Sequence, residues 1–451
     1  MKKTVSLLLV ALTGLALYAQ DSYSTYRYVG GDISLLPSYE QYNTPYKTST
    51  GTTIPDLVTY AANTLHWNAC RVRLFVNPVI TNADGTKQGE VQDLPYVTAL
   101  GKRIKDAGMA FMLDFHYSDT WADPVKQTIP QAWQSLSEQE LHDTMYTYTK
   151  MCLETLVAAG ATPDFVQIGN EISYGMLWHS NATQNNADKA YPNSYYYTGN
   201  TDAAWTRFTG FLNQASRAVR EVCPDAKIII HIERTAQSAT CVNYYRNIAA
   251  GNVDYDIIGL SYYPFWHGYM NSTEGSELKT TLEALHTLCP NRNIQIVETA
   301  YYNNYFPYTS SNHNPSKGIY YTADKWPATS AGQKAYLDDL VTFLANYDYV
   351  NGLYYWFPEE NGCGGPSWNA NTIVITNWIN RGLFDPNTHK ALAGLNALEA
   401  FIPTDQATGL DEVAVPQNGI YYNILGMPFG SDYDALSNGL YIIDGTKILK
   451  H

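Results

Sequence analysis

Short apolar runs recur along the chain, and each is followed by a longer stretch that has helical periodicity or a loop-rich composition. Eight such runs are present, at Tyr28–Ile33, Ala69–Phe75, Ala110–His116, Phe165–Gly169, Lys227–Ile232, Ile257–Tyr262, Ile294–Val297 and Gly352–Trp356. Helical patterns lie between them at Asp93–Ala107, Glu138–Ala159, Asp202–Val222, Gly275–Leu288 and Gln333–Ala345, and a last helix is expected at Ala391–Phe401. Strands that alternate with helices are typical of a parallel sheet, and eight such units predict a closed (β/α)8 barrel of the α/β class.

If the chain forms a (β/α)8 barrel, the ends of its predicted strands should carry polar residues. Active-site groups of such barrels stand at the carboxyl ends of the strands, where the following loops begin. Every predicted strand carries a residue that can form a hydrogen bond at or near this end: Asp32, Arg71 with Arg73, His116, Asn170 with Glu171, His231, Tyr262, Glu298 and Trp356. Random placement would put Val or Leu at several of these positions. The agreement across eight strands indicates a functional site at this end of the barrel.

The chain divides into four predicted segments. Residues 1–19 read as a signal peptide, with Lys2 and Lys3 before the apolar stretch Val5–Leu17, which is too short to span a bilayer. Residues 20–403 form the barrel, 404–416 a linker, and 417–451 a small β-rich C-terminal segment with no assigned catalytic role. We therefore expect an exported protein without a transmembrane segment, and its location in a periplasm, at the cell surface or outside the cell stays open.

Composition narrows the classes of ligand. The chain has 28 Lys and Arg against 42 Asp and Glu, a formal net charge of −14, which argues against nucleic acid as a partner. Its 38 Tyr and 10 Trp suit a protein that stacks aromatic rings against a neutral, hydroxyl-rich ligand. The six cysteines are scattered singly, so no structural zinc is expected, and all fifteen complete disulfide pairings remain open.

Two glutamates at strand ends are the strongest chemical signal. Glu171 follows the fourth predicted strand and Glu298 ends the seventh. A carboxylate in such a place is costly unless it is paired or exposed in a cleft, and for one glutamate alone a structural ion pair is an equal alternative. Two of them in the fourth and seventh units face each other across the barrel mouth. A glycosidase that retains configuration needs such a pair, about 5–5.5 Å apart.

The same residues carry a family resemblance. The pair Asn170-Glu171 after strand four, together with Glu298 after strand seven, resembles clan A of the glycoside hydrolases. The resemblance implies that Glu171 is the acid/base and Glu298 the nucleophile. It also implies that Asn170 binds the sugar 2-hydroxyl.

The loops narrow the resemblance to one family. The stretch Leu113–Pro124, followed by Gln127, Pro130 and Ala132-Trp133, resembles a signature of glycoside hydrolase family 53, the endo-β-1,4-galactanases. Further matches are Gly30–Ser34, Gly169–Ile172 with Gly175 and Leu177-Trp178, and Gly259–Gly268, so that the resemblance covers residues 28 to about 400. It implies an endo-acting enzyme that cleaves β-1,4-galactan of type I arabinogalactan or pectin. The alternatives are another clan A β-glycanase, such as a mannanase, and a non-catalytic glycan-binding barrel.

The remaining candidates are expected to bind substrate or to support the two glutamates. Trp121, Trp178, Trp266 and Trp356 offer flat faces for a pyranose ring, whereas Trp133 is expected to pack in the core. Asp119, Asp123 and His267 are expected to form hydrogen bonds with sugar hydroxyls.

Among the strand-end residues, Arg71 and Arg73 lie on one face of their strand, and we expect one of them to pair with Glu298 and keep it ionised. Tyr262 is expected to form a hydrogen bond with the nucleophile. His116 and His231 orient carboxylates or bind hydroxyls, and a buried structural role for His231 is an equal alternative.

Two stretches depart from the family pattern. Relatives carry Tyr-Trp-Glu-Pro at strand eight, where this chain has Phe357 in place of the Glu, with Glu359 and Glu360 following. Some bacterial relatives hold calcium in an acidic loop, but the run Ser310–Pro315 lacks the carboxylates that a hard cation prefers. We therefore expect no calcium, no other metal and no cofactor, and we expect a monomer.

Overall fold

The computed structural model describes residues 23–41, 45–78, 90–178, 202–270, 278–304, 325–362, 380–404, 406, 420–423, 427–430, 436, 439–443 and 446–450. The predicted signal peptide (1–19), most of the predicted linker (404–416) and the run Ser310–Pro315 considered for calcium lie outside these residues. Expectations about those three stretches remain predictions.

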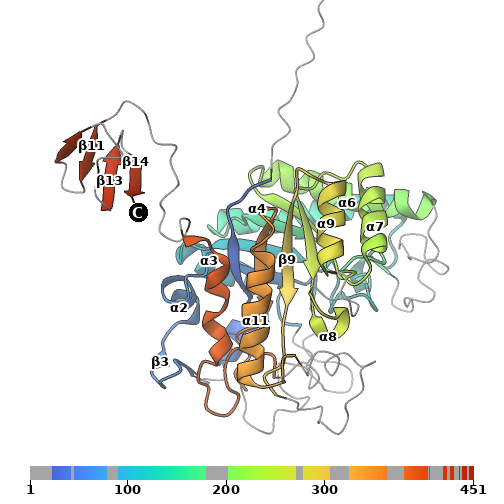
Figure 1. Ribbon diagram of the computed structural model, residues 1–451. Coiled ribbons are helices and arrows are strands. Elements are labelled where there is room, and N and C mark those ends of the chain that lie inside the picture. Colours follow the sequence, from blue (N-terminus) through green and yellow to red (C-terminus); the bar gives the residue numbers. More distant parts are fainter. Residues whose placement is uncertain are drawn as a thin grey trace, which may run out of the picture.

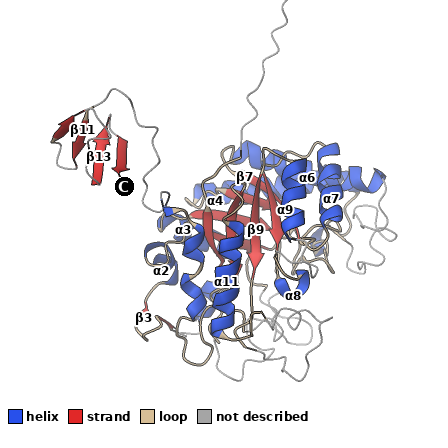
Figure 2. Cartoon of the chain, in the orientation of Figure 1, coloured by secondary structure: helices blue, strands red, loops and turns tan. Residues whose placement is uncertain are grey.

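Eight parallel strands close into a barrel, with hydrogen-bonded neighbours in the order β1-β10-β9-β8-β7-β6-β5-β4. The strands are β1 (Tyr28–Asp32), β4 (Ala69–Leu74), β5 (Ala110–Phe115), β6 (Phe165–Ile168), β7 (Lys227–Ile232), β8 (Ile257–Ser261), β9 (Asn293–Thr299) and β10 (Val350–Trp356). Figures 1 and 2 show these strands in the interior, with helices around them. The predicted (β/α)8 fold is confirmed.

The helices follow the strands along the chain. They are α1 (Leu36–Gln41), α2 (Leu57–Asn63), α3 (Leu94–Asp106), α4 (Glu138–Ala158), α6 (Asp202–Val222), α7 (Ser238–Ala250), α8 (Pro264–His267), α9 (Leu278–Leu288) and α11 (Ser330–Leu344). Local sequence explains their starts: Ser137 and Glu140 form a capping box at the beginning of α4, and the side chain of Asp93 caps α3.

The expected last helix, Ala391–Phe401, is wrong. This stretch forms two short 3-10 helices instead, η7 (Ala393–Asn396) and η8 (Leu398–Phe401). Gly394 packs so closely on α11 that a Cβ atom there would lie 3.2 Å from the Leu337 side chain. Tighter 3-10 turns are typical of short connecting segments that must fit against a neighbouring helix.

Side chains inside the barrel form layers that change from apolar to polar toward the carboxyl ends of the strands. One layer is a hydrophobic cluster: Ala69, Met112, Phe165, Ile229, Ile257, Val297 and Tyr354. Because alternate residues of a strand point to the same face, positions two further along also face inward. Met112 is thus followed by Asp114, and Ile229 by His231, both fully buried. This buried polar layer is the floor of the functional site.

The C-terminal residues form a separate antiparallel sheet with the strand order β12-β11-β13-β14. Its strands are β11 (Tyr421–Asn423), β12 (Pro428–Gly430), β13 (Gly439–Ile443) and β14 (Thr446–Lys450). Before β4, the short strands β2 (Tyr46–Lys47) and β3 (Thr53–Ile54) pair as a hairpin that the hydrophobic pattern does not predict.

Candidate active site

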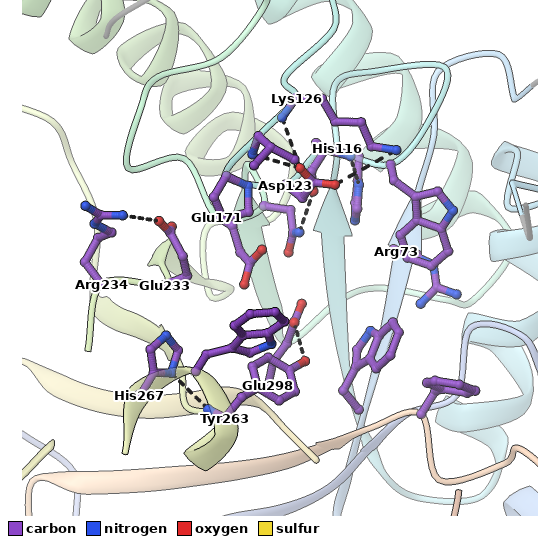
Figure 3. Close-up of a pocket in the computed structure, with 18 of the residues that line it drawn as sticks. Arg73, His116, Asp123, Lys126, Glu171, Glu233, Arg234, Tyr263, His267 and Glu298 are labelled. Carbon is purple, nitrogen blue, oxygen red and sulfur yellow. Dashed lines mark hydrogen bonds and ion pairs between the residues drawn. The ribbon is translucent and has the colours of Figure 1, made fainter. Parts of the chain in front are cut away.

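A cavity of about 580 Å³ opens at the carboxyl ends of the barrel strands (Figure 3). Its lining includes four aromatic side chains, Trp121, Trp266, Trp356 and Phe357. The polar and charged lining is Arg71, Arg73, His116, Asp123, Lys126, Asn170, Glu171, Glu233, Arg234, Gln237, Tyr263, His267 and Glu298. A hollow that combines flat rings with many hydrogen-bonding groups suits a sugar chain.

Glu298 lies near the end of β9 and is held by two partners. Its Oε1 forms an ion pair with Nη1 of Arg71 at 2.9 Å, which confirms the expectation that one of the two arginines pairs with this glutamate. The hydroxyl of Tyr263 donates a hydrogen bond to its Oε2 at 2.8 Å. The pKa of Glu298 is raised, with burial as the largest cause, and Arg71 and Tyr263 oppose this rise. Both contacts stabilise the ionised form, which is the form that a nucleophile needs.

Glu171 follows β6 in a strained turn. Its φ angle of 48° lies in the left-handed region, which is uncommon for residues other than glycine, and Gly169, two residues earlier, has φ 120°. Burial raises the pKa of Glu171 well above its ordinary value, and the charges of Glu298 and Glu233 raise it further. Figure 3 shows the carboxyl groups of Glu171 and Glu298 in the same pocket. The group with the stronger tendency to keep its proton is therefore Glu171.

A chain of hydrogen bonds positions the Glu171 carboxyl. The backbone N–H of Glu171 donates to Nδ1 of His231 at 3.3 Å, so Nδ1 is the acceptor nitrogen of that ring. The ring Nε2 then carries the hydrogen and bonds Ser261 Oγ at 2.8 Å, and the Ser261 hydroxyl donates to Glu171 Oε1 at 2.7 Å. Burial lowers the pKa of His231 well below its ordinary value, which keeps the ring neutral in this role.

Arg71 connects the two halves of the site. Besides Glu298, its guanidinium group bonds Asp32 at 2.7 Å, Asp114 at 2.8 Å and the side-chain oxygen of Asn170 at 2.7 Å. Asn170 in turn donates to the backbone oxygen of Ala122 at 2.8 Å. The planar fork of arginine matches several acceptors at once, so one side chain fixes both the nucleophile and the residue before Glu171.

Most of the other predicted site residues line the cavity. Arg73 lies over the ring of Trp121, with its Cζ 4.2 Å from the ring centroid, and Trp121 makes an edge contact with Trp356 at 6.2 Å. His116 and Asp123 line the same region, and burial lowers the pKa of His116. The predicted residues Trp266 and His267 line the cavity from α8.

Five predicted substrate-binding residues do not line the cavity. Asp32 and His231 are fully buried beneath it, where they support Arg71 and Glu171. Asp119 accepts hydrogen bonds from the backbone N–H groups of Asn77 and Gln131, so it organises a loop. The remaining two are Trp178 and Tyr262.

Trp178 is not a sugar platform in this structure. Its side chain is fully buried, and its indole N–H donates to the backbone oxygen of Tyr174 at 3.2 Å. The backbone of Trp178 pairs with Thr128, which holds this segment against the neighbouring loop. Trp133, which was expected in the core, is also buried.

The side chain of Tyr262 does not bond the carboxyl group of Glu298. Its hydroxyl donates to the backbone oxygen of Gly268 at 2.7 Å, whereas the next residue, Tyr263, bonds Glu298. Ile257, Ser261 and Tyr263 are separated by even numbers of residues, so simple alternation places Tyr263 on the inward face and Tyr262 on the opposite one. Sequence reasoning therefore chose the wrong member of the pair.

Glu233 is a cavity residue that sequence reasoning missed. It is the first residue after β7 and lies two positions beyond His231, so strand alternation could have placed it on the inward face. Its carboxyl group accepts a hydrogen bond from Ser173, and burial raises its pKa to about 7.

Neither a metal-binding cluster nor a disulfide is present among the described residues. In the described part of the chain, no cluster of three or more His, Cys, Asp or Glu side chains could hold a metal ion. The five cysteines that the structure describes are Cys70, Cys152, Cys223, Cys241 and Cys289, and none of these is in a disulfide. Among the described helices, none has the length and apolar character needed to cross a membrane.

Comparison with known proteins identifies the family. The model of "Glycosyl hydrolase family 53" matches residues 28–401, which is the whole barrel. The chain belongs to glycosyl hydrolase family 53. This family 53 member is 34% identical to an uncharacterized protein of Niallia circulans, over 82% of this chain and 93% of that protein. It is 31% identical to the arabinogalactan endo-β-1,4-galactanase of Thermothelomyces thermophilus, over 77% of this chain and 94% of that enzyme.

Solved structures agree with the assignment. The family 53 catalytic domain of Ignisphaera aggregans superposes with a TM-score of 0.68 at 28% identity, over 88% of this chain and all of that domain. A fungal β-1,4-galactanase superposes with a TM-score of 0.64 at 27% identity, over 82% of this chain and 98% of that one. The protein is thus a glycosidase built on a (β/α)8 barrel.

In the loop after β10, Phe357 stands where the family resemblance described above implies a Glu. Phe357 lines the cavity, but the two following glutamates do not. Glu359 accepts a hydrogen bond from the backbone N–H of Leu35 at 2.9 Å, and Glu360 accepts one from Gly362 at 3.0 Å. Both are buried anchors of the loop rather than replacements for the missing cavity carboxylate.

Proposed function

We propose that this enzyme is an endo-β-1,4-galactanase that acts on the galactan of type I arabinogalactan or pectin. Membership of family 53 and relatives that carry the galactanase name over most of this chain support the substrate. The observation that carries the chemistry is one cavity that holds Glu171 and Glu298 in different environments.

In the proposed mechanism, the carboxylate of Glu298 attacks the anomeric carbon while Glu171 gives its proton to the departing glycosidic oxygen. A covalent glycosyl–enzyme ester forms on Glu298 and the C–O bond to the leaving sugar breaks. Glu171, now ionised, then takes a proton from a water molecule whose oxygen attacks the same carbon. The ester bond breaks, Glu298 is released as a carboxylate, and the configuration of the sugar is retained.

The environment of each glutamate supports its role. Arg71 and Tyr263 stabilise the negative charge of Glu298 before attack and after release. Burial and the neighbouring charge of Glu298 keep the proton on Glu171 until the leaving oxygen receives it. When Glu298 becomes an uncharged ester, this charge disappears, the pKa of Glu171 falls, and the same group can act as a base.

The other cavity residues are proposed to bind the polysaccharide. Trp121, Trp266 and Trp356 stack on sugar rings, and Asn170 binds the 2-hydroxyl next to the reacting carbon. Further hydroxyls are bound by Arg73, His116, Asp123 and His267. All of these side chains line the cavity, which supports the assignment.

We further propose that the enzyme works as an exported monomer without a cofactor. The charged and apolar start of the chain supports export.

The experiment that tests the function is digestion of linear β-1,4-galactan beside mannan, xylan and cellulose, with the product sizes resolved. We expect short galacto-oligosaccharides from galactan and no products from the other three. Activity on mannan alone would show that a different clan A substrate is correct. Lack of hydrolysis of all four would favour a glycan-binding protein.

A further inference from the structure

A third glutamate lies in the catalytic cavity. Glu233 follows the last residue of β7, and its side chain is only 8% exposed although it lines the cavity. Figure 3 shows Glu233 beside Glu171 and on the other side of the pocket from Arg73. The mechanism above gives this residue no task.

The two oxygens of Glu233 differ in their partners. Oε1 accepts a hydrogen bond from the Ser173 hydroxyl at 2.6 Å and lies 3.7 Å from Nη1 of Arg234. Oε2 is buried, and no residue that the structure describes donates to it. A buried polar atom without a partner costs about 1–3 kcal/mol, so a ligand that supplies the missing partner gains from the contact. The terminal torsion of a glutamate is broad, which lets this oxygen turn into the cavity.

The position of Glu233 relative to the two catalytic glutamates indicates which sugar it meets. Ser173, its hydrogen-bond donor, is two residues after Glu171 on the same loop. The charge of Glu233 also raises the pKa of Glu171. Glu233 is therefore a neighbour of the acid/base, which delivers its proton to the sugar that leaves.

We propose that Oε2 of Glu233 binds a hydroxyl of the sugar unit that departs on cleavage, and that Glu233 thereby helps to select galactan as the leaving chain. The proposal rests on the galactanase function given above. Burial raises the pKa of Glu233 to about 7, so the rates below are compared at a pH above this value, where the group is a carboxylate. The carboxylate accepts the hydroxyl hydrogen, whereas the amide nitrogen of a glutamine can only donate.

The test compares two substrates that differ in the leaving group. Galactotetraose leaves a sugar beside Glu171, whereas a 4-nitrophenyl β-1,4-galactobioside leaves an aryl group that has no sugar hydroxyls. The variant Glu233→Gln retains an oxygen for Ser173 and replaces the other oxygen by an amide nitrogen. We expect kcat/KM for galactotetraose to fall about 10-fold or more, because a hydrogen bond to a charged group is worth about 1.5–3 kcal/mol. The value for the aryl substrate should change less than about 2-fold.

Glu90 provides a matched control. It is also buried, its Oε1 accepts a hydrogen bond from the Thr120 hydroxyl at 2.7 Å, and its Oε2 has no partner among the described residues. Unlike Glu233 it does not line the cavity, so Glu90→Gln should leave both rates unchanged. Equal losses on the two substrates in Glu233→Gln would make Glu233 a positioning residue for Glu171 and overturn the proposal, as would no loss on either.

The same measurements separate this proposal from the function on which it rests. A wild-type enzyme that does not cleave galactotetraose would overturn the galactanase function and this inference together. A wild-type enzyme that cleaves it, with an unchanged ratio of the two rates in Glu233→Gln, would overturn the inference alone. Unfolding midpoints of both variants show whether a loss of rate comes from a loss of folded protein.

Discussion

The guanidinium group of Arg71 lies 2.9 Å from the carboxylate of Glu298. The same group pairs with Asp32 at 2.7 Å and Asp114 at 2.8 Å, so one cation serves three buried carboxylates. The charges of Asp114 and Asp32 raise the pKa of Glu298, and Arg71 opposes them. The ionisation of Glu298 therefore depends on this arginine more than on any other single charge.

Replacement of Arg71 by lysine tests this dependence. An ammonium group retains the charge but cannot bond all three carboxylates and Asn170 in one geometry. We expect kcat/KM to fall on the order of 100-fold through the lost charged hydrogen bonds. The pKa of Glu298 should rise, and since protonated Glu298 is inactive, the acidic limb of the pH profile should move to higher pH. The measurement is kcat/KM against pH.

A half-exposed arginine serves as the control. Arg103 forms two hydrogen bonds with Glu40, at 2.8 and 2.9 Å, and neither residue lines the cavity. Arg103→Lys should leave the pH profile unchanged. An acidic limb that stays in place in Arg71→Lys would contradict the role given to Arg71.

Azide distinguishes the roles of the two glutamates. Glu298→Ala should lose at least about 10⁴-fold in activity, because no covalent intermediate can form. Azide that enters the vacated space attacks from the same side as the carboxylate and yields an inverted, α-configured azide product. Glu171→Ala should lose about 10²–10⁴-fold on galactan. With a dinitrophenyl leaving group it should still form the ester, and azide should then give the β-configured product.

The anomeric configuration of the azide products, determined by NMR, decides the assignment. If Glu171→Ala gives the α product and Glu298→Ala the β product, the two roles are exchanged. If both variants hydrolyse galactan at near-normal rates, neither residue is catalytic.

The barrel could be predicted from sequence because buried parallel strands read as short apolar runs. The run Ala69–Phe75 coincides with β4 to within one residue, and the polar residues at the strand ends mark the cavity. The stretch Ala391–Phe401 shows the opposite case. Its spacing of apolar residues predicts one helix, but the stretch forms two 3-10 helices, η7 and η8, that pack against α11. The hydrophobic pattern therefore predicts an element well when no contact with a neighbouring helix changes its backbone geometry.

The candidate site was predictable where a residue lies within a barrel strand. Glu298 and Arg71 are such residues, and their ion pair was expected. Beyond the strand ends the prediction failed: Tyr263, two residues after the inward-facing Ser261, bonds Glu298 in place of the predicted Tyr262. The path of a loop decides which tryptophans reach the cavity, and periodicity contains no information about that path.

The two neighbouring tyrosines offer a paired test. The Tyr263 hydroxyl donates to Glu298 at 2.8 Å and lowers its pKa, so Tyr263→Phe should shift the acidic limb of kcat/KM to higher pH. The rate should fall on the order of 10- to 100-fold, as expected for loss of a hydrogen bond to a charged group. Tyr262→Phe loses a bond to the backbone oxygen of Gly268. It should cost about 1 kcal/mol of stability and leave the acidic limb in place.

Tryptophan replacements separate core packing from substrate contact. The side chain of Trp178 is fully buried, whereas that of Trp266 is 66% exposed at the cavity. Trp178→Ala should lower the free energy of unfolding by about 3–5 kcal/mol, because it leaves a large void. Trp266→Ala should change that free energy by less than about 0.5 kcal/mol. It should instead raise KM for galactan about 3- to 10-fold through the lost stacking surface.

Urea unfolding gives the free energy of unfolding of the two tryptophan variants, and steady-state kinetics gives KM for each. We expect Trp178→Ala to change mainly the free energy of unfolding and Trp266→Ala to change mainly KM. A raised KM in Trp178→Ala with normal stability would show that this indole reaches the substrate after all. An unchanged KM in Trp266→Ala would remove the most exposed ring of the cavity from the proposed binding surface. The galactan chain would then rest on Trp121 and Trp356, which already contact each other on the wall near Arg73.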